Sequence, residues 1–134
     1  MREGPEWPYV RGGTTPSGKP FDLGERTFLF ARRVMQIVRR IPRITENLVL
    51  IDQFADCGTS IGANISEADP SDSKKEQVKY LRISRRSARE TRFWLRLIEA
   101  EVPSVGDLAS DRDEVTQLVR ILSALITKLS ARPA

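Results

Sequence analysis

The chain of 134 residues contains no histidine and a single cysteine, Cys57. A Ser-His-Asp or Cys-His catalytic arrangement needs a histidine, and zinc sites of the Cys-rich or Cys/His-rich kind need several such ligands. The composition excludes these sites, and we expect no metal ion and no other cofactor. One cysteine also forms no disulfide within the chain, which fits a reducing cytoplasm.

Long apolar runs are also missing. No stretch approaches the roughly 20 apolar residues that a membrane-spanning helix needs, and the amino terminus lacks the apolar run of a secretory signal. We therefore expect a soluble, cytoplasmic protein that makes no contact with a membrane. A chain of this length is sufficient for one domain with its own core.

Charge is divided unevenly along the chain, whose net charge is +4 and whose sequence pI is about 9.6. Residues 44–72 contain six acids and no base, whereas residues 73–101 contain nine Lys or Arg and four acids. A basic segment of this kind is compatible with nucleic acid, an anionic surface or an acidic protein as partner.

Residues 1–20 are rich in glycine and proline and show little apolar periodicity. We predict a disordered tail, with the alternative that Trp7 and Tyr9 dock it loosely on a surface of this or another subunit. Within residues 21–132, apolar residues recur at helical spacing in four segments. These segments are residues 22–41, 45–69, 73–101 and 112–131.

Proline and capping residues set the predicted helix ends. Pro42, Pro70 and Pro103 follow three of the segments, while Ser73 and Glu76 form a capping-box pattern before the third. We expect Asp22 and Asp111 to cap the first and last helices. Short connections predict an all-α, antiparallel up-down-up-down four-helix bundle. The apolar stripe expected for the first helix is Phe28, Ala31, Val34, Met35, Val38 and Ile41.

The third segment has an apolar stripe on one side and cations on the other. Arginine favours phosphate, because its planar guanidinium makes bidentate contacts. We predict a nucleic-acid-binding face, and the alternative is an ordinary solvated surface. The predicted residues are Lys75, Lys79, Arg82, Arg86, Arg89 and Arg96, with help from Arg32, Arg39 and Arg40.

Small and polar residues follow a second stripe on the second helix. We interpret Ser60, Asn64, Glu67, Ser87 and Glu90 as a structural polar network between the second and third helices or across a subunit contact. Arg85 and Arg92 are the expected partners of its acids. The alternative is that Glu67 and Glu90 form a carboxylate pair that holds a hard cation or transfers a proton.

Three short motifs occur in a fixed order: S-I-G-A-N-I-S-E-A at residues 60–68, S-K-K-E at 73–76, and S-x-x-E at 87–90. Together they resemble the family of 23S rRNA intervening-sequence proteins, over about residues 22–130. The resemblance implies a four-helix bundle that forms a cyclic homopentamer without demonstrated enzymatic activity. It also implies similarity to the accessory variability determinant of diversity-generating retroelements, a basic pentamer that works with reverse transcriptase and nucleic acid.

The chain departs from the family pattern at Ala68, where glycine is common, and in the tail of residues 1–20. We expect a non-enzymatic, oligomeric bundle that binds RNA, DNA or a ribonucleoprotein through its basic face. The alternative is a protein-protein adaptor or scaffold ring that does not contact nucleic acid and docks an acidic protein such as a polymerase.

Overall fold

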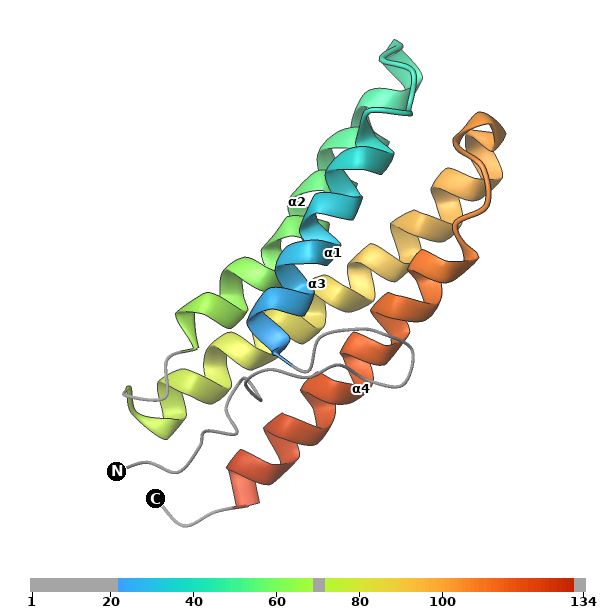
Figure 1. Cartoon of the computed structure of the whole chain (residues 1–134). Helices are drawn as coiled ribbons and strands as arrows, with labels where there is room; N and C mark the ends of the chain where they lie inside the picture. The colour runs from blue at the N-terminus through green and yellow to red at the C-terminus, as the bar shows by residue number, and fades with distance from the viewer. Residues whose placement is uncertain (1–21, 69–71, 132–134) are drawn as a thin grey trace.

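The computed structural model describes residues 22–68 and 72–131, and in these residues it contains helices and no strand (Figure 1). Four α-helices follow one another: α1 (Leu23–Val38), α2 (Leu48–Glu67), α3 (Lys74–Glu101) and α4 (Ala109–Ala131). The 3₁₀ turns η1 (Thr45–Asn47) and η2 (Pro103–Val105) precede α2 and α4. The helices alternate in direction, which confirms the predicted all-α, up-down-up-down bundle. The tail predicted for residues 1–20 lies outside the described residues.

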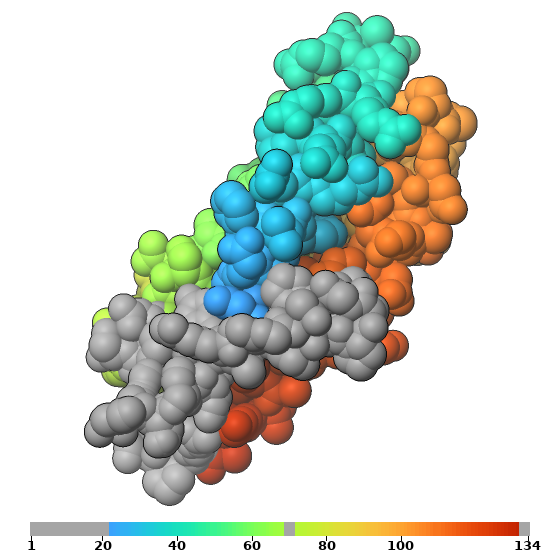
Figure 2. Space-filling model, viewed as in Figure 1, coloured from blue at the N-terminus to red at the C-terminus, as the bar shows by residue number. Residues whose placement is uncertain are grey.

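Helices that follow one another in sequence pack together: α1 with α2, α2 with α3, and α3 with α4. In Figure 1, α1 passes in front of α3, and these two helices lie at opposite corners of the bundle. The backbones of α1 and α4 do not pack closely, although the two helices lie beside each other on the face shown in Figure 2. None of the described helices is both long and apolar enough to span a lipid bilayer.

The apolar faces of α2, α3 and α4 form the core, and the face predicted for α1 is only partly correct: Val34 and Ile41 are buried as expected, but other members are not. Phe28 is 57% exposed and Met35 is 39% exposed, whereas Phe30 and Ile37 are buried. Apolar residues occur on several sides of this helix, so spacing alone does not select one face. The side of α1 that is buried carries Leu23, Arg26, Thr27, Phe30, Val34 and Ile37.

Two glycines of α2 explain which face of α1 is buried. A Cβ at Gly58 would lie 2.7 Å from Cγ2 of Val34, and one at Gly62 would lie 3.1 Å from Oγ1 of Thr27. Because the glycines have no side chain, α1 approaches α2 closely on the side that carries Thr27 and Val34.

Two predicted caps are confirmed. The carboxylate of Asp22 accepts a hydrogen bond from the Glu25 N–H, and the hydroxyl of Ser73 accepts one from the Glu76 N–H, each at 3.1 Å. The cap predicted at Asp111 was wrong. Asp107 accepts from the Ala109 N–H at 2.9 Å, so α4 starts three residues earlier than expected.

Other helix ends also differ from the prediction. Helix α1 ends at Val38 rather than at residue 41, because the N–H groups of Arg40 and Ile41 bond three residues back in a tighter turn. Helix α2 begins at Leu48, since the segment expected to open it, Thr45–Asn47, forms the 3₁₀ turn η1. Helix α2 ends at Glu67, before the predicted residue 69. Residue 132, the predicted end of the domain, is not among those described.

Candidate nucleic-acid interface on helix α3

Six cations follow one exposed face of α3, and we call them the α3 stripe. Successive members are separated by three, four or seven residues, so their side chains leave the helix in nearly the same direction. At 1.5 Å per residue, the stripe extends for about 32 Å. All six side chains are exposed, as the sequence predicted: Lys75, Lys79, Arg82, Arg86, Arg89 and Arg96.

The stripe faces outward because the opposite side of α3 is core. Leu81, Ala88, Leu95 and Ile98 are fully buried there. The buried Ser84 donates its hydroxyl proton to the Ile61 carbonyl of α2 at 2.9 Å, so the polar group in this interface is satisfied. Rotating α3 to hide the cations would expose this apolar face, which fixes the orientation of the stripe.

Little of the positive charge is neutralised within the described part of the chain. Only Lys79 of the stripe has an ion pair there, with Glu76 at 3.4 Å, and this contact raises the pKa of Lys79. Nearby, burial lowers the pKa of Arg85, and the charges of Arg89 and Arg82 lower it further. The arginines therefore repel one another, and an anion bound beside them would relieve that repulsion.

A shallow groove of about 660 Å³ lies beside the amino-terminal half of the stripe, between α3 and the end of α4. Val78 and Ile83 supply its apolar surface. Because cations and apolar side chains line the same groove, it suits a ligand that is both anionic and partly apolar. The remaining lining residues are Lys74, Lys75, Lys79, Arg82, Arg86 and Ser130.

The structure separates the other three predicted cations from the stripe. Arg32, Arg39 and Arg40 are exposed, but Arg32 lies on α1 and the other two directly follow it. Because α1 and α3 are at opposite corners, the three arginines belong to a different surface of the molecule.

Only one part of the predicted polar network is present among the described residues. The amide of Asn64 donates to the carbonyl and to the hydroxyl of Ser60, at 2.9 and 3.0 Å. Ser87 is buried and its carbonyl accepts from the Thr91 hydroxyl. Glu67 and Glu90 are exposed, and neither side chain has a hydrogen bond or ion pair to another described residue. Within the described part of the chain, the two acids therefore do not join the network.

Arg85 and Arg92 bond to helix α4 rather than to the acids predicted for them. Arg85 donates to the Ser123 hydroxyl at 3.2 Å, and Arg92 reaches the Thr116 hydroxyl at 3.4 Å. Both arginines thus lie between α3 and α4, on the flank of the α3 stripe.

Two bidentate ion pairs join α1 to α4, and neither was predicted from the sequence. The buried Arg26 donates two hydrogen bonds to Glu114, at 2.7 and 2.9 Å, and a third to Gln117 at 2.8 Å. Arg33 makes a bidentate pair with Asp111, at 2.8 and 3.0 Å. The sequence held one indication that Arg26 is buried and needs an acidic partner, because Arg26 lies one turn before Phe30, on the buried side of α1.

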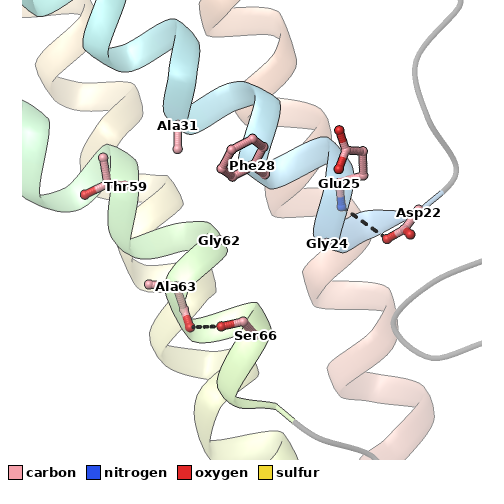
Figure 3. A pocket seen from close by; sticks show the side chains of 9 residues that line it. All are labelled: Asp22, Gly24, Glu25, Phe28, Ala31, Thr59, Gly62, Ala63 and Ser66. Atoms are coloured by element: carbon pink, nitrogen blue, oxygen red, sulfur yellow. Dashed lines mark hydrogen bonds between the residues drawn. The ribbon is translucent and has the colours of Figure 1, made fainter.

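A second groove, of about 530 Å³, lies between α1 and α2 (Figure 3). Phe28 and Ala31 of α1 line one side, and Thr59, Gly62 and Ala63 of α2 line the other. The small side chains of α2 leave room beside the exposed phenylalanine. The groove is completed near the start of α1 by Asp22, Gly24 and Glu25, and on α2 by Ser66.

Within the described ranges, no three His, Cys, Asp or Glu side chains are grouped so that they could hold a metal ion. Cys57 is buried, and burial raises the pKa of its thiol to about 11. At neutral pH the thiol is therefore protonated and a poor nucleophile.

Comparison with known proteins gives a family match and similar solved structures. Residues 20–124 match the family described as 23S rRNA-intervening sequence protein. Among solved structures, the chain is similar to a crystal structure from Bacteroides thetaiotaomicron, described as a protein with unknown function from the S23 ribosomal protein family. The two are 27% identical with a TM-score of 0.66, and the alignment covers 78% of this chain and 94% of that one. A search of curated proteins gave no match.

Proposed function

The chain belongs to the family of 23S rRNA-intervening sequence proteins, and from that premise we propose that it is a non-enzymatic bundle that binds nucleic acid through the α3 stripe. The observation that carries the proposal is the row of exposed cations, of which Lys75, Arg82, Arg86, Arg89 and Arg96 have no ion pair to another described residue. A rigid helix holds them in line.

Phosphate contacts of this kind bind the backbone of a nucleic acid and do not read its sequence. Successive cations of the stripe are mostly about 5 Å apart along the helix, so one strand following α3 brings a phosphate near each. Binding releases counterions, and affinity falls as salt rises. We therefore propose RNA, DNA or a ribonucleoprotein as the partner class, bound without sequence specificity.

We further propose that the protein is a homo-oligomer in the cytoplasm. The α1/α2 groove and the exposed Phe28 and Met35 support self-association, because they offer apolar surface to a second copy. The resemblance implies a pentamer, in which five stripes would act together. Light scattering tests this, and five times the 15.2 kDa of one chain is the expected mass. A monomer at working concentration would contradict it.

Fluorescence anisotropy with a labelled 20-nucleotide RNA tests the binding site. We expect a dissociation constant in the micromolar range or tighter at low salt, as for non-specific contacts between cations and phosphates. Reversing Lys75, Arg82 and Arg86 to Glu together should abolish binding. If five phosphates are contacted, the slope of log K against log salt should be about −3.5 for a single strand.

The matched control reverses three arginines at the opposite corner, Arg32, Arg39 and Arg40. It changes the net charge by the same amount but leaves the α3 stripe intact, so we expect a much smaller loss of affinity. Equal losses in the two triple variants would show that net charge alone drives binding. Tight binding by the α3 variant would refute the site.

A protein-protein adaptor is the second candidate, favoured by the apolar surface of Val78 and Ile83 within the basic groove. An acidic segment with apolar residues fits that combination, and the resemblance points to a reverse transcriptase as such a partner. Pull-down before and after nuclease treatment separates the candidates. Only an adaptor retains its partner once nucleic acid has been removed.

A further inference from the structure

One exposed aromatic residue interrupts the α3 stripe. Phe93 is 55% exposed, four residues after Arg89 and three before Arg96. The spacing places its ring on the same face as the cations, where the helical repeat would otherwise bring another basic residue. Burial therefore does not account for this phenylalanine.

The ring of Phe93 packs against that of Trp94. The centroids of the two rings are 5.2 Å apart, and their planes meet at 83°, an edge-to-face arrangement. In such a contact at least one flat face of the phenylalanine is not covered by its partner. A side chain that is packed against a neighbour and open on one face loses little freedom when a planar ligand stacks on it.

The charges around Phe93 indicate how that ligand is placed. Arg89 and Arg96 flank the ring along the helix axis, whereas the exposed Glu90 lies one turn before it on the side of the stripe. The carboxylate of Glu90 disfavours a phosphate directly at position 93, and the two arginines favour phosphates on either side. An unpaired nucleotide satisfies both conditions when its base lies on the ring and its neighbouring phosphates lie on the arginines.

We propose that Phe93 is a stacking platform for an unpaired base, so that the α3 stripe prefers single-stranded nucleic acid to duplex. This inference rests on the proposed function and adds the class of ligand. Aromatic side chains that stack on bases are a general device of single-strand-binding proteins, and each is tolerant of sequence because every base has a flat face. In a duplex the bases are stacked on one another, so no base face is free to stack on the ring of Phe93.

Three variants test the platform. Phe93→Leu keeps an apolar side chain without a ring, Phe93→Tyr keeps the ring, and Val49→Ala shortens the apolar side chain of an equally exposed residue of α2, 56% exposed. Anisotropy is measured with a 20-nucleotide single strand and with the duplex of the same sequence. We expect Phe93→Leu to weaken single-strand binding roughly tenfold and to leave duplex binding unchanged. The other two variants should bind both ligands like the unaltered protein.

Crosslinking gives an independent readout. A single strand containing 4-thiouridine, irradiated in the complex and digested, should yield a crosslinked peptide that contains position 93. The crosslink should be lost in Phe93→Leu, whereas binding through the arginines persists.

The outcomes separate this inference from the proposed function. If the unaltered protein binds neither ligand, the proposed function fails, and the platform fails with it. If it binds both and Phe93→Leu lowers neither affinity, the platform is refuted while the basic interface stands. A change in solution mass caused by Phe93→Leu would overturn the inference in another way, since it would place Phe93 in a contact between copies of the chain.

Discussion

Gly58 and Gly62 show how single residues of α2 set its distance from α1. They lie one turn apart and face the buried Val34 and Thr27. From the sequence, the close approach of α1 to these two glycines was not predicted. Spacing within α2 reports which residues share a face, whereas the residues that face them across the interface depend on the rotation of α1.

We expect Gly58→Ala to destabilise the protein by about 1–2 kcal/mol. Alanine favours the helix by about 1 kcal/mol, but its Cβ would lie 2.7 Å from a methyl group of the fully buried Val34, and overpacking of a core costs up to about 3 kcal/mol. Urea denaturation followed by circular dichroism measures the change.

Gly62→Ala serves as the comparison for Gly58→Ala, because its new Cβ meets Thr27 at the longer distance of 3.1 Å. Gly62→Ala should therefore lower the free energy of unfolding by less than Gly58→Ala does. An unchanged or higher free energy of unfolding for Gly58→Ala would show that α1 shifts freely and that the close approach is not required.

At the scale of elements, α3 was the most predictable helix and α1 the least. The S-x-x-E pattern at Ser73 fixes the start of α3, and a clear contrast between apolar and charged residues fixes its buried face. In α1, apolar residues occur on several sides, and the glycines of α2 decide among them. The cations of the α3 stripe were predictable for the same reason, since an outward face follows once the inward one is known.

The predicted polar network was less accessible to sequence reasoning. Ser60, Asn64 and Glu67 share one side of α2, but hydrogen bonding between helices depends on distances of about 3 Å that residue spacing does not supply. Ser84 makes the buried bond between α2 and α3 instead. The exposed Phe93 was also missed, because a core stripe was sought and this residue lies opposite to it.

Glu99 joins the end of α3 to the start of α4. Its carboxylate accepts hydrogen bonds from the Leu108 N–H at 3.0 Å and from Arg112 at 2.6 Å. The Leu108 N–H, and then Arg112, lower the pKa of Glu99 below its ordinary value of 4.5. A lowered pKa means that this contribution to stability is complete above pH 4.5 and is lost as the pH falls through the pKa of the folded protein.

Glu99→Gln should therefore lower the free energy of unfolding by about 1 kcal/mol at pH 7 and by almost nothing near pH 2. Urea titrations across this pH range measure the difference. The control is Glu101→Gln, because the side chain of Glu101 is exposed and has no hydrogen bond or ion pair to another described residue. If Glu99→Gln lowers the free energy of unfolding equally at every pH, the ionised carboxylate of Glu99 is not the source of the stabilisation.

At the scale of the whole molecule, the fold class and family were predictable from the sequence, but the contact between α1 and α4 was not. Four periodic segments with short connections restrict the chain to a bundle. Which charged residues cross between its first and last helices depends on the final geometry. The pairs Arg26–Glu114 and Arg33–Asp111 span this contact because the two backbones do not pack closely there.

Arg26→Met should destabilise the protein by about 2–3 kcal/mol, because it removes three hydrogen bonds that the buried Arg26 donates to Glu114 and Gln117. Thermal or urea unfolding measures the loss. Arg33→Met is the milder comparison, since the side chain of Arg33 is 35% exposed. Equal, small losses in both variants would indicate that water replaces either arginine without difficulty.

The order of helix packing has a kinetic consequence. Each helix packs on the one that precedes it in the sequence, so most contacts join residues that are close along the chain. Topologies of this kind fold quickly. The link between Arg26 and Glu114, 88 residues apart, closes a long loop and is expected to form after the transition state. In stopped-flow chevrons, Arg26→Met should accelerate unfolding and leave the refolding rate nearly unchanged, whereas slower refolding would place α4 beside α1 early in folding.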